Sequence, residues 1–262
     1  MSNETNSTNS LINIPELPPS VDNALKNLTD EPTKNVGHTL GDIWYLVFGG
    51  ISQAAKKKQM KYDKDLEKYY QELNQKTDEI PNECRIEPSL QVTAQALENS
   101  KYCISSEILR KMFVNLISGS MNKCLEPHVH PSFPEILKQL SENDARFIQT
   151  FKQESSILIA NIGIKVSTLT SPAYAKDVCV LPNLSLDTKQ GCISISSLRR
   201  AGLLETTYIE WFANDSMYDK IKVTSIYKSL DNKAHLNGYT VNLEKGMCRL
   251  TNVGKEFVKV CV

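Results

Sequence analysis

Apolar residues recur every three or four positions along residues 33–77, the spacing that puts side chains on one face of an α-helix. The pattern is interrupted at Gly49-Gly50, because two glycines in a helix interior cost about 2 kcal/mol relative to alanine. We therefore predict two long helices in this stretch. Their apolar stripes consist of Val36, Leu40, Ile43 and Val47 before the glycines and of Ala55, Tyr62, Leu66, Tyr69 and Leu73 after them.

Start signals and apolar periodicity predict further helices over residues 88–151. Residues 107–117 are apolar on a wide face and follow two serines, which predicts a capped, buried, central helix. Two capping boxes, in which a serine is followed three residues later by an acid, would start two short helices. They are Ser132 with Glu135 and Ser141 with Asp144. Residues 33–155 are therefore predicted to form a helical domain.

The composition of the chain changes after this helical stretch. Residues 156–190 are rich in β-branched residues, serine and proline, which predicts an irregular linker region of short strands and loops. Residues 193–201 are then predicted to form a helix that Gly202 ends, because glycine readily adopts the left-handed conformation found at helix C-termini. A strand that begins at Leu203 is predicted to follow.

A β-hairpin is predicted over residues 238–250, with its turn at Glu244-Lys245-Gly246. Thr251 would cap a last helix. Helix, strand, hairpin and helix is the order of elements at the end of a winged-helix domain, so residues 191–262 are predicted to be winged-helix-like. The predicted fold class is mainly α with an α+β part: an N-terminal helical bundle with long helices and a C-terminal winged-helix-like domain.

Composition and charge narrow the class of protein. Thirty basic residues balance thirty acidic ones, so a globally basic nucleic-acid binder is disfavoured. Residues 1–32 start with a stretch rich in Ser, Thr and Asn, which predicts a disordered or loosely ordered arm without a signal peptide. The seven cysteines are scattered, as expected for reduced thiols in a cytoplasmic protein.

Candidate catalytic and metal-binding residues are few. Cys124, His128 and His130 are ligand types that lie close together, but their spacing lacks a fourth ligand, so we predict no metal site. The sequence contains no nucleophile elbow, phosphate-binding loop or dinucleotide fingerprint. We therefore predict no catalytic residues, no cofactor and no enzymatic activity.

Small and aromatic residues in the first predicted helix form a candidate contact face. Small residues four apart let a second backbone approach closely, which suits either a helix that touches a membrane or another copy of the chain, or tight packing within a soluble bundle. The apolar run at 40–51 is too short to span a bilayer and contains Asp42, which favours packing. The candidate residues for partner contact or an effector role are Gly37, Gly41, Trp44, Phe48 and Gly49.

Two surfaces are candidates for contacts with macromolecules. Arg199 and Arg200 would reach DNA if their helix entered a major groove, as in DNA-binding winged helices. The weak positive charge of the C-terminal part favours a protein contact over DNA, since specific DNA binding needs several phosphate contacts. The apolar stripe from Tyr62 to Leu73 is a candidate seam between two copies of the chain.

The segment HPSFPEILKQLS at residues 130–141, which leads directly to Asp144-Ala145, is the most distinctive block of the chain. Together with Leu40-Gly41-Asp42 and RKMFVNLI at residues 110–117, it resembles the abortive infection alpha family of bacterial proteins, which is implicated in defence against bacteriophage. The resemblance implies a cytoplasmic protein that limits phage multiplication, and it transfers no catalytic residue. The motif positions are His130, Pro131, Ser132, Phe133 and Leu140, which we interpret as a turn, a cap and core anchors.

Three functional hypotheses follow. The first is a non-enzymatic anti-phage defence protein that acts by binding a phage or host protein, or by exposing the apolar helix at 40–51 in a population shift. The second is a winged-helix DNA-binding regulator, and the third is a protein-interaction scaffold that forms a homo-oligomer. Residues 208–236, a long insertion for a simple wing, are the candidate for specificity.

Overall fold

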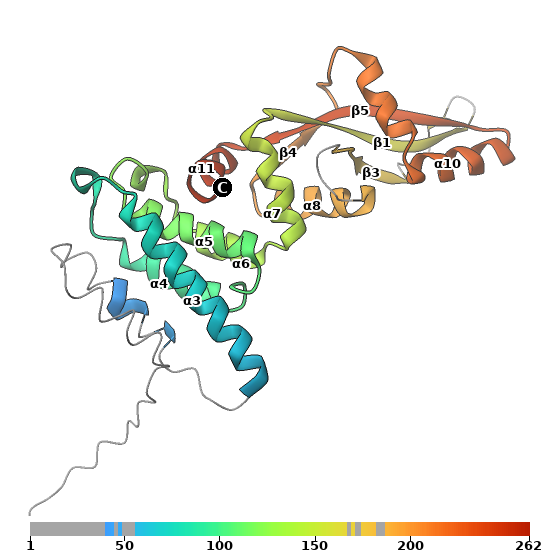
Figure 1. The fold of residues 1–262 in the computed structure, drawn as a ribbon. Coiled ribbons are helices and arrows are strands. Elements are labelled where there is room, and N and C mark those ends of the chain that lie inside the picture. The colour runs from blue at the N-terminus through green and yellow to red at the C-terminus, as the bar shows by residue number, and fades with distance from the viewer. Residues whose placement is uncertain (1–39, 45–46, 49–55, 167–168, 171–173, 182–186) are drawn as a thin grey trace, which may run out of the picture.

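The computed structural model describes residues 40–44, 47–48, 56–166, 169–170, 174–181 and 187–262. These residues form a helical half and a half built on a β-sheet, and the two halves lie end to end (Figure 1). None of the helices in these segments combines the length and the apolar character needed to cross a lipid bilayer.

The helical half contains α3 (Lys56–Asp78), α4 (Leu90–Ser100), α5 (Glu107–Ser120), α6 (Phe133–Gln139) and α7 (Glu142–Gln149). It is arranged around one buried helix, α5, which packs against α3, α4, α6 and α7. Residues 40–44 and 47–48 are also helical. Three short 3₁₀ turns join the longer elements: η1 (Asn82–Cys84), η2 (Glu126–His128) and η3 (Thr150–Lys152). The predicted Lys-rich helix and the predicted central helix are thus confirmed, while Gly49-Gly50 lies outside the described residues.

The sheet half contains an antiparallel sheet whose spine is the long pair β1 and β5. Its strands are β1 (Ser156–Val166), β2 (Leu169–Thr170), β3 (Ala175–Val178), β4 (Leu204–Thr207) and β5 (Thr240–Leu250). β4 pairs with β5, and both β2 and β3 pair with β1. The helical elements of this half are α8 (Thr188–Arg200), η4 (Asp215–Tyr218), α9 (Asp219–Lys222) and α10 (Ser225–Leu236). The chain ends in α11 (Asn252–Cys261), which packs on the helical half.

Two sequence predictions for the C-terminal part are wrong. The region 156–190, predicted as an irregular linker, contains β1, the central strand of the sheet. Residues 157–160 and 162–164 are all buried, so the strand lacks the alternation of apolar and polar residues that marks a half-exposed strand. The segment 238–250, predicted as a hairpin, contains instead the single strand β5.

Gly246 lies in the middle of β5, opposite Ile159 of β1, and not in a turn. A Cβ atom at this position would lie 2.6 Å from Cδ1 of Tyr208 and would collide with the carbonyl oxygen of Thr207. The glycine therefore lets β4 and the following loop approach β5 closely. Because the winged-helix-like arrangement was inferred from the hairpin, it is not confirmed, whereas the mixture of a mainly helical chain with an antiparallel sheet is.

Local signals at helix ends were more reliable. Ser141 accepts a hydrogen bond from the backbone N–H of Asp144, whose carboxylate in turn accepts one from the backbone N–H of Ser141, so the predicted capping box is formed. Thr251 accepts a hydrogen bond from Gly254 N–H at the start of α11. Gly202, at φ +75°, follows α8 as predicted.

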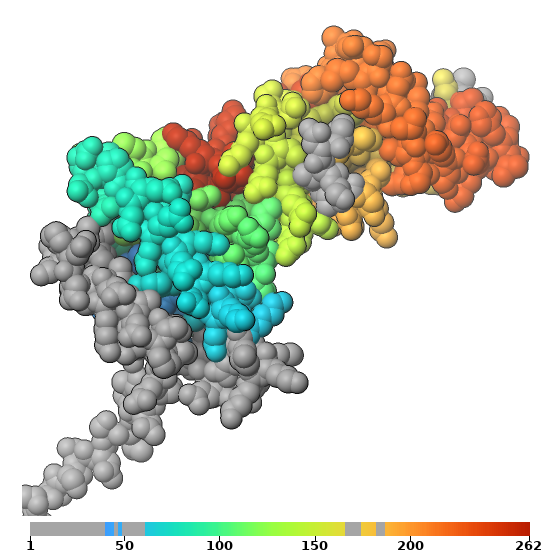
Figure 2. Space-filling model, viewed as in Figure 1, coloured from blue at the N-terminus to red at the C-terminus, as the bar shows by residue number. Residues whose placement is uncertain are grey.

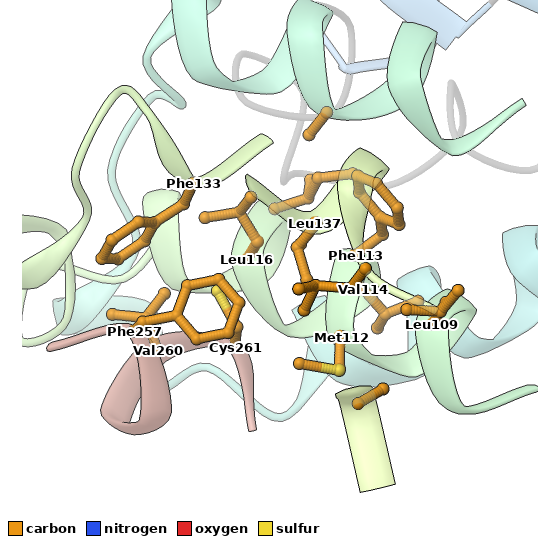
Figure 3. Close-up of a cluster of buried hydrophobic side chains, with 14 of the residues drawn as sticks. Leu109, Met112, Phe113, Val114, Leu116, Phe133, Leu137, Phe257, Val260 and Cys261 are labelled. Carbon is orange, nitrogen blue, oxygen red and sulfur yellow. The ribbon is translucent and has the colours of Figure 1, made fainter. Parts of the chain in front are cut away.

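The main hydrophobic core is continuous across the two halves. Phe257 and Val260 of α11 pack against α5 and α6, where they face Leu116 and Phe133 (Figure 3). The space-filling view shows α11 (red) against the helical half (Figure 2). The predicted domain boundaries at 155 and 190 therefore run through a shared core, because the last helix of the chain returns to the helical half.

Candidate functional site

The apolar segment at 40–48 packs against α3 through a cluster of aromatic rings. Trp44 and Phe48, both candidates from the sequence, are only 1% and 2% exposed. The Trp44 ring centroid lies 4.6 Å from that of Phe48, 5.3 Å from that of Tyr69 and 5.4 Å from that of Tyr70. Tilted and edge-on contacts of this kind are the favourable ones for aromatic rings. The segment is therefore part of the core in this conformation.

The glycines predicted beside these aromatics are placed only in part. Gly41 is partly buried on the described portion of the segment. Gly37 and Gly49 lie outside the described residues. The remaining apolar positions of the segment, Leu40, Ile43 and Val47, are buried with Trp44 and Phe48. The expected tight packing of this stripe within the chain is thus confirmed for residues 40–44 and 47–48.

An ion pair holds α3, the helix beneath the segment, to the central helix. Arg110 of α5 donates to both carboxylate oxygens of Glu72, at 2.9 and 2.8 Å, and to the carbonyl oxygen of Ile104 at 2.9 Å. The hydrogen bonds with Glu72 raise the pKa of the almost fully buried guanidinium. A bidentate pair of this kind fixes orientation as well as distance. The ion pair therefore fixes the position of α3, against which the segment at 40–48 packs.

The predicted dimer seam on α3 is already occupied within the chain. Leu66, Tyr69 and Leu73 are buried in the main core, and burial raises the pKa of Tyr69. These side chains pack with α5 and with the segment at 40–48, so in this conformation they cannot join two copies. The seam interpretation is wrong because a stripe at helical spacing marks burial without saying which surface covers it.

The family-motif residues divide into core anchors and an exposed turn. Phe133 and Leu140 are buried, and the Phe133 ring meets that of Phe257 edge-on at a centroid distance of 5.2 Å (Figure 3). His130 and Pro131 are exposed. The two buried positions lie in the main core, as expected of anchors, and Phe133 ties α6 to α11.

Ser132 does not cap α6 as predicted. Its hydroxyl lies 2.7 Å from Nδ1 of His130, and its backbone N–H also donates to that nitrogen, at 3.2 Å. Because Nδ1 accepts from the N–H, it carries no proton, and the hydroxyl donates to it as well. The serine hydroxyl is thus bound to the histidine ring and not to a backbone N–H at the start of α6. His130, Pro131 and Ser132 form a turn that this contact holds together.

A three-residue polar chain, which the sequence did not suggest, joins η2 to α11. Lys259 Nζ lies 2.6 Å from Nε2 of His128, and Nδ1 of the same ring lies 2.6 Å from Oε2 of Glu256. Since an ammonium can only donate, Nε2 is the acceptor and Nδ1–H donates to the carboxylate. The partners are separated by about 130 residues in the sequence, so no local pattern signals this contact.

The three potential metal ligands from the sequence turn to different partners. Cys124 contacts another thiol, His128 pairs with Glu256, and His130 pairs with Ser132. Within the described parts of the chain, no three His, Cys, Asp or Glu side chains converge on a point that could hold a metal ion.

The two predicted DNA-contact arginines have different roles. Arg199 donates to the buried carboxylate of Asp177 at 3.1 Å, and the hydroxyl of Tyr208 donates to the same carboxylate at 2.7 Å. Burial and this hydrogen bond raise the pKa of Tyr208. Asp177 itself has a φ of +55°, which is uncommon for a residue other than glycine. Arg199 therefore neutralises a buried acid, and Arg200 alone faces an open groove.

This groove, which we call the α8 groove, has an apolar floor and a basic rim. It has a volume of about 650 Å³ and lies between β3, α8 and α10. Its lining residues are Ala175, Lys176, Lys189, Cys192, Ile193, Ser196, Ser197, Arg200 and Ile226. No carboxylate is among them, and Lys176, Lys189 and Arg200 form no ion pair within the described part of the chain. Ile193 leaves 57% of its surface exposed at the groove.

Comparison with known families gives a match over most of the chain. A family model described as abortive infection alpha matches residues 61–261. The matched range begins within α3 and ends with the last residue of α11. The segment at 40–48 precedes the matched region. Neither the curated proteins nor the solved structures give a match.

Proposed function

The chain belongs to the abortive infection alpha family, and from this membership we propose that it is a phage-defence protein that acts by binding and by exposing a buried segment, not by catalysis. The observation that supports the proposal is the burial of an apolar cluster that contacts Tyr69 and Tyr70 of α3, made up of Leu40, Ile43, Trp44, Val47 and Phe48. The segment precedes the matched region and contacts α3 through Tyr69 and Tyr70, and in this proposal it detaches while the contacts between α5 and α11 persist.

In the proposed mechanism the segment changes between a docked and a detached state. A phage or host component that binds only the detached state shifts the population toward it. To move the ratio from 1:99 to 99:1, such a partner must favour the detached state by about 5.5 kcal/mol. Detachment uncovers Trp44 and Phe48, and exposed apolar patches are typical sites of contact with a protein or a membrane.

A plaque assay combined with host viability tests this function. The variant Trp44→Ala weakens docking, so cells that express it should lose viability even without phage. The control Leu90→Ala removes an apolar side chain that is already 61% exposed, and it should leave viability and protection unchanged. Wild-type viability and wild-type phage plating with a folded Trp44→Ala protein would contradict the proposed role of the segment.

A second candidate function is partner recognition at the α8 groove. Three cationic side chains surround an apolar floor there, a combination that suits an acidic protein segment with one apolar anchor. The winged-helix DNA-binding regulator remains the alternative for this surface. A phosphate backbone would use the cations but not the exposed Ile193, which is why we favour a protein.

Charge reversal separates these alternatives. The double variant Lys189→Glu/Arg200→Glu should abolish protection, while Lys123→Glu, an exposed lysine in the helical half, should not. A gel shift with duplex DNA at low salt should show no binding by the wild-type chain. Binding that falls steeply with salt and disappears in the double variant would instead establish the DNA-binding function.

A further inference from the structure

Two cysteines from distant parts of the chain have their sulfur atoms in contact. Sγ of Cys84, at the end of η1, lies 3.9 Å from Sγ of Cys124 in the loop between α5 and η2. The Cys84 thiol is partly buried and Cys124 is exposed. These two residues are 40 positions apart, so the fold brings them together.

The backbone on both sides of the pair is fixed by hydrogen bonds. Arg85 and Asn122 form an isolated antiparallel bridge. Lys123 N–H donates to the carbonyl oxygen of Cys84 at 2.8 Å, and Cys124 N–H donates to Oδ1 of Asn122 at 2.9 Å. The two thiols therefore meet because of ordered main-chain pairing, and a disulfide bond of about 2.05 Å would shorten their sulfur–sulfur distance by about 2 Å.

The other thiols of the chain are placed differently. Cys179, Cys248 and Cys261 are buried, and burial raises the pKa of Cys179 and of Cys248 to about 12. Cys103 and Cys192 are partly buried, and Cys192 lies near enough to the buried Cys179 to contribute to the raised pKa of that thiol. Cys84 and Cys124 thus form the accessible, facing pair, and Cys103 is a matched single thiol.

We propose that Cys84 and Cys124 form a reversible dithiol site that exchanges with low-molecular-weight disulfides such as glutathione disulfide. The exposed Cys124 thiolate attacks one sulfur of glutathione disulfide, which forms a mixed disulfide and releases one glutathione thiolate. Cys84 then attacks the Cys124 sulfur, which forms the internal disulfide and releases the second glutathione. Two protein thiols are oxidised, one external disulfide is reduced to two thiols, and the two protons of the cysteines pass to the released thiolates.

The order of attack follows from the surroundings of the two thiols. Cys124 is exposed and Cys84 is partly buried, so an external disulfide reaches Cys124 first and Cys84 suits the second, resolving step. The disulfide would join the connection between α3 and α4 to the loop that leads to His128 and the HPS turn. Closing a covalent ring of this length restricts the unfolded chain, so the oxidised protein should unfold at a higher temperature.

The test uses the full-length chain and glutathione buffers of graded oxidation state. After each equilibration, iodoacetamide alkylates the remaining thiols, and mass spectrometry of peptides assigns every cysteine. We expect a linked pair of peptides that contain Cys84 and Cys124, lost on treatment with dithiothreitol, with two fewer alkylated thiols per chain. Cys103 should remain alkylated under buffers that close the pair, because it lacks a facing sulfur.

Two further outcomes are decisive. In the variant Cys84→Ser, glutathione should accumulate on Cys124, since the resolving thiol is gone, while Cys103→Ser should form the disulfide as the wild-type chain does. A stable glutathione adduct on Cys124 of the wild-type chain, a disulfide between other cysteines, or unmodified thiols in the most oxidising buffer would each overturn the dithiol site. The readout is chemical and does not depend on phage protection, so it stands apart from the proposed function.

Discussion

Trp44→Ala should detach the segment at 40–48 without unfolding the rest of the chain. Trp44 is 1% exposed and touches three aromatic rings, so its truncation should cost about 3–5 kcal/mol. Each 1.4 kcal/mol changes an equilibrium tenfold, so the detached population should rise by roughly a hundred- to several-thousand-fold. α5 lies deeper and keeps its contacts with α6, α7 and α11, so its stability should change much less.

Hydrogen exchange followed by mass spectrometry measures this effect directly. Peptides that cover residues 40–48 should exchange at least a hundredfold faster in Trp44→Ala, while peptides from α5 keep their protection. The control Leu90→Ala should exchange as the wild-type chain does, since Leu90 is mostly exposed. Equal acceleration of the segment and of α5 would show that they unfold as one unit, and the reasoning about a releasable segment would be refuted.

Three further predictions concern the shared core, the α3–α5 ion pair and the buried thiols. Phe257→Ala should lower the free energy of unfolding by about 3–5 kcal/mol in urea denaturation, and a loss below about 1 kcal/mol would contradict the docking of α11 on α6. Arg110→Ala and Glu72→Ala each break the ion pair, so the double variant should lose less stability than the sum of the two single variants. Strictly additive shifts in the unfolding temperature would argue against coupling between the two side chains. Burial raises the pKa of Cys179 and of Cys248 from 9.0 to about 12, so these thiols lose their protons at lower pH in the unfolded chain than in the folded one. The free energy of unfolding should therefore fall as the pH rises from about 9 toward 12. An unfolding midpoint that stays constant over that range would contradict their burial.

The sequence predicted elements well where the signal is local. The buried face of α5, the capping box at Ser141 and the cap at Thr251 are all as predicted, because periodicity and capping act within a few residues. The central strand β1 was missed because it is buried on both faces and so lacks alternation. Gly246 was interpreted as a turn residue, although it serves close approach of Tyr208.

Contacts between distant segments could not be predicted from a single sequence. The chain from Lys259 through His128 to Glu256 and the thiol pair join positions that are far apart in the sequence. Their residue types carry no spacing signal, because the fold and not the local chain sets their distance. Trp44 and Phe48 were identified as candidates together with the small residues of the first predicted helix, but only the structure shows that they pack against α3.

The fluorescence of Trp44 during infection tests the central claim most directly. The chain has two tryptophans, and Trp211 is 52% exposed, so the variant Trp211→Phe leaves Trp44 as the single buried reporter. Purified from uninfected cells, this variant should emit at the short wavelength of a buried indole, and the addition of extract from phage-infected cells should shift the emission to longer wavelength. Emission that stays at the short wavelength, with a variant that still protects cells against phage, would contradict defence through exposure of the segment.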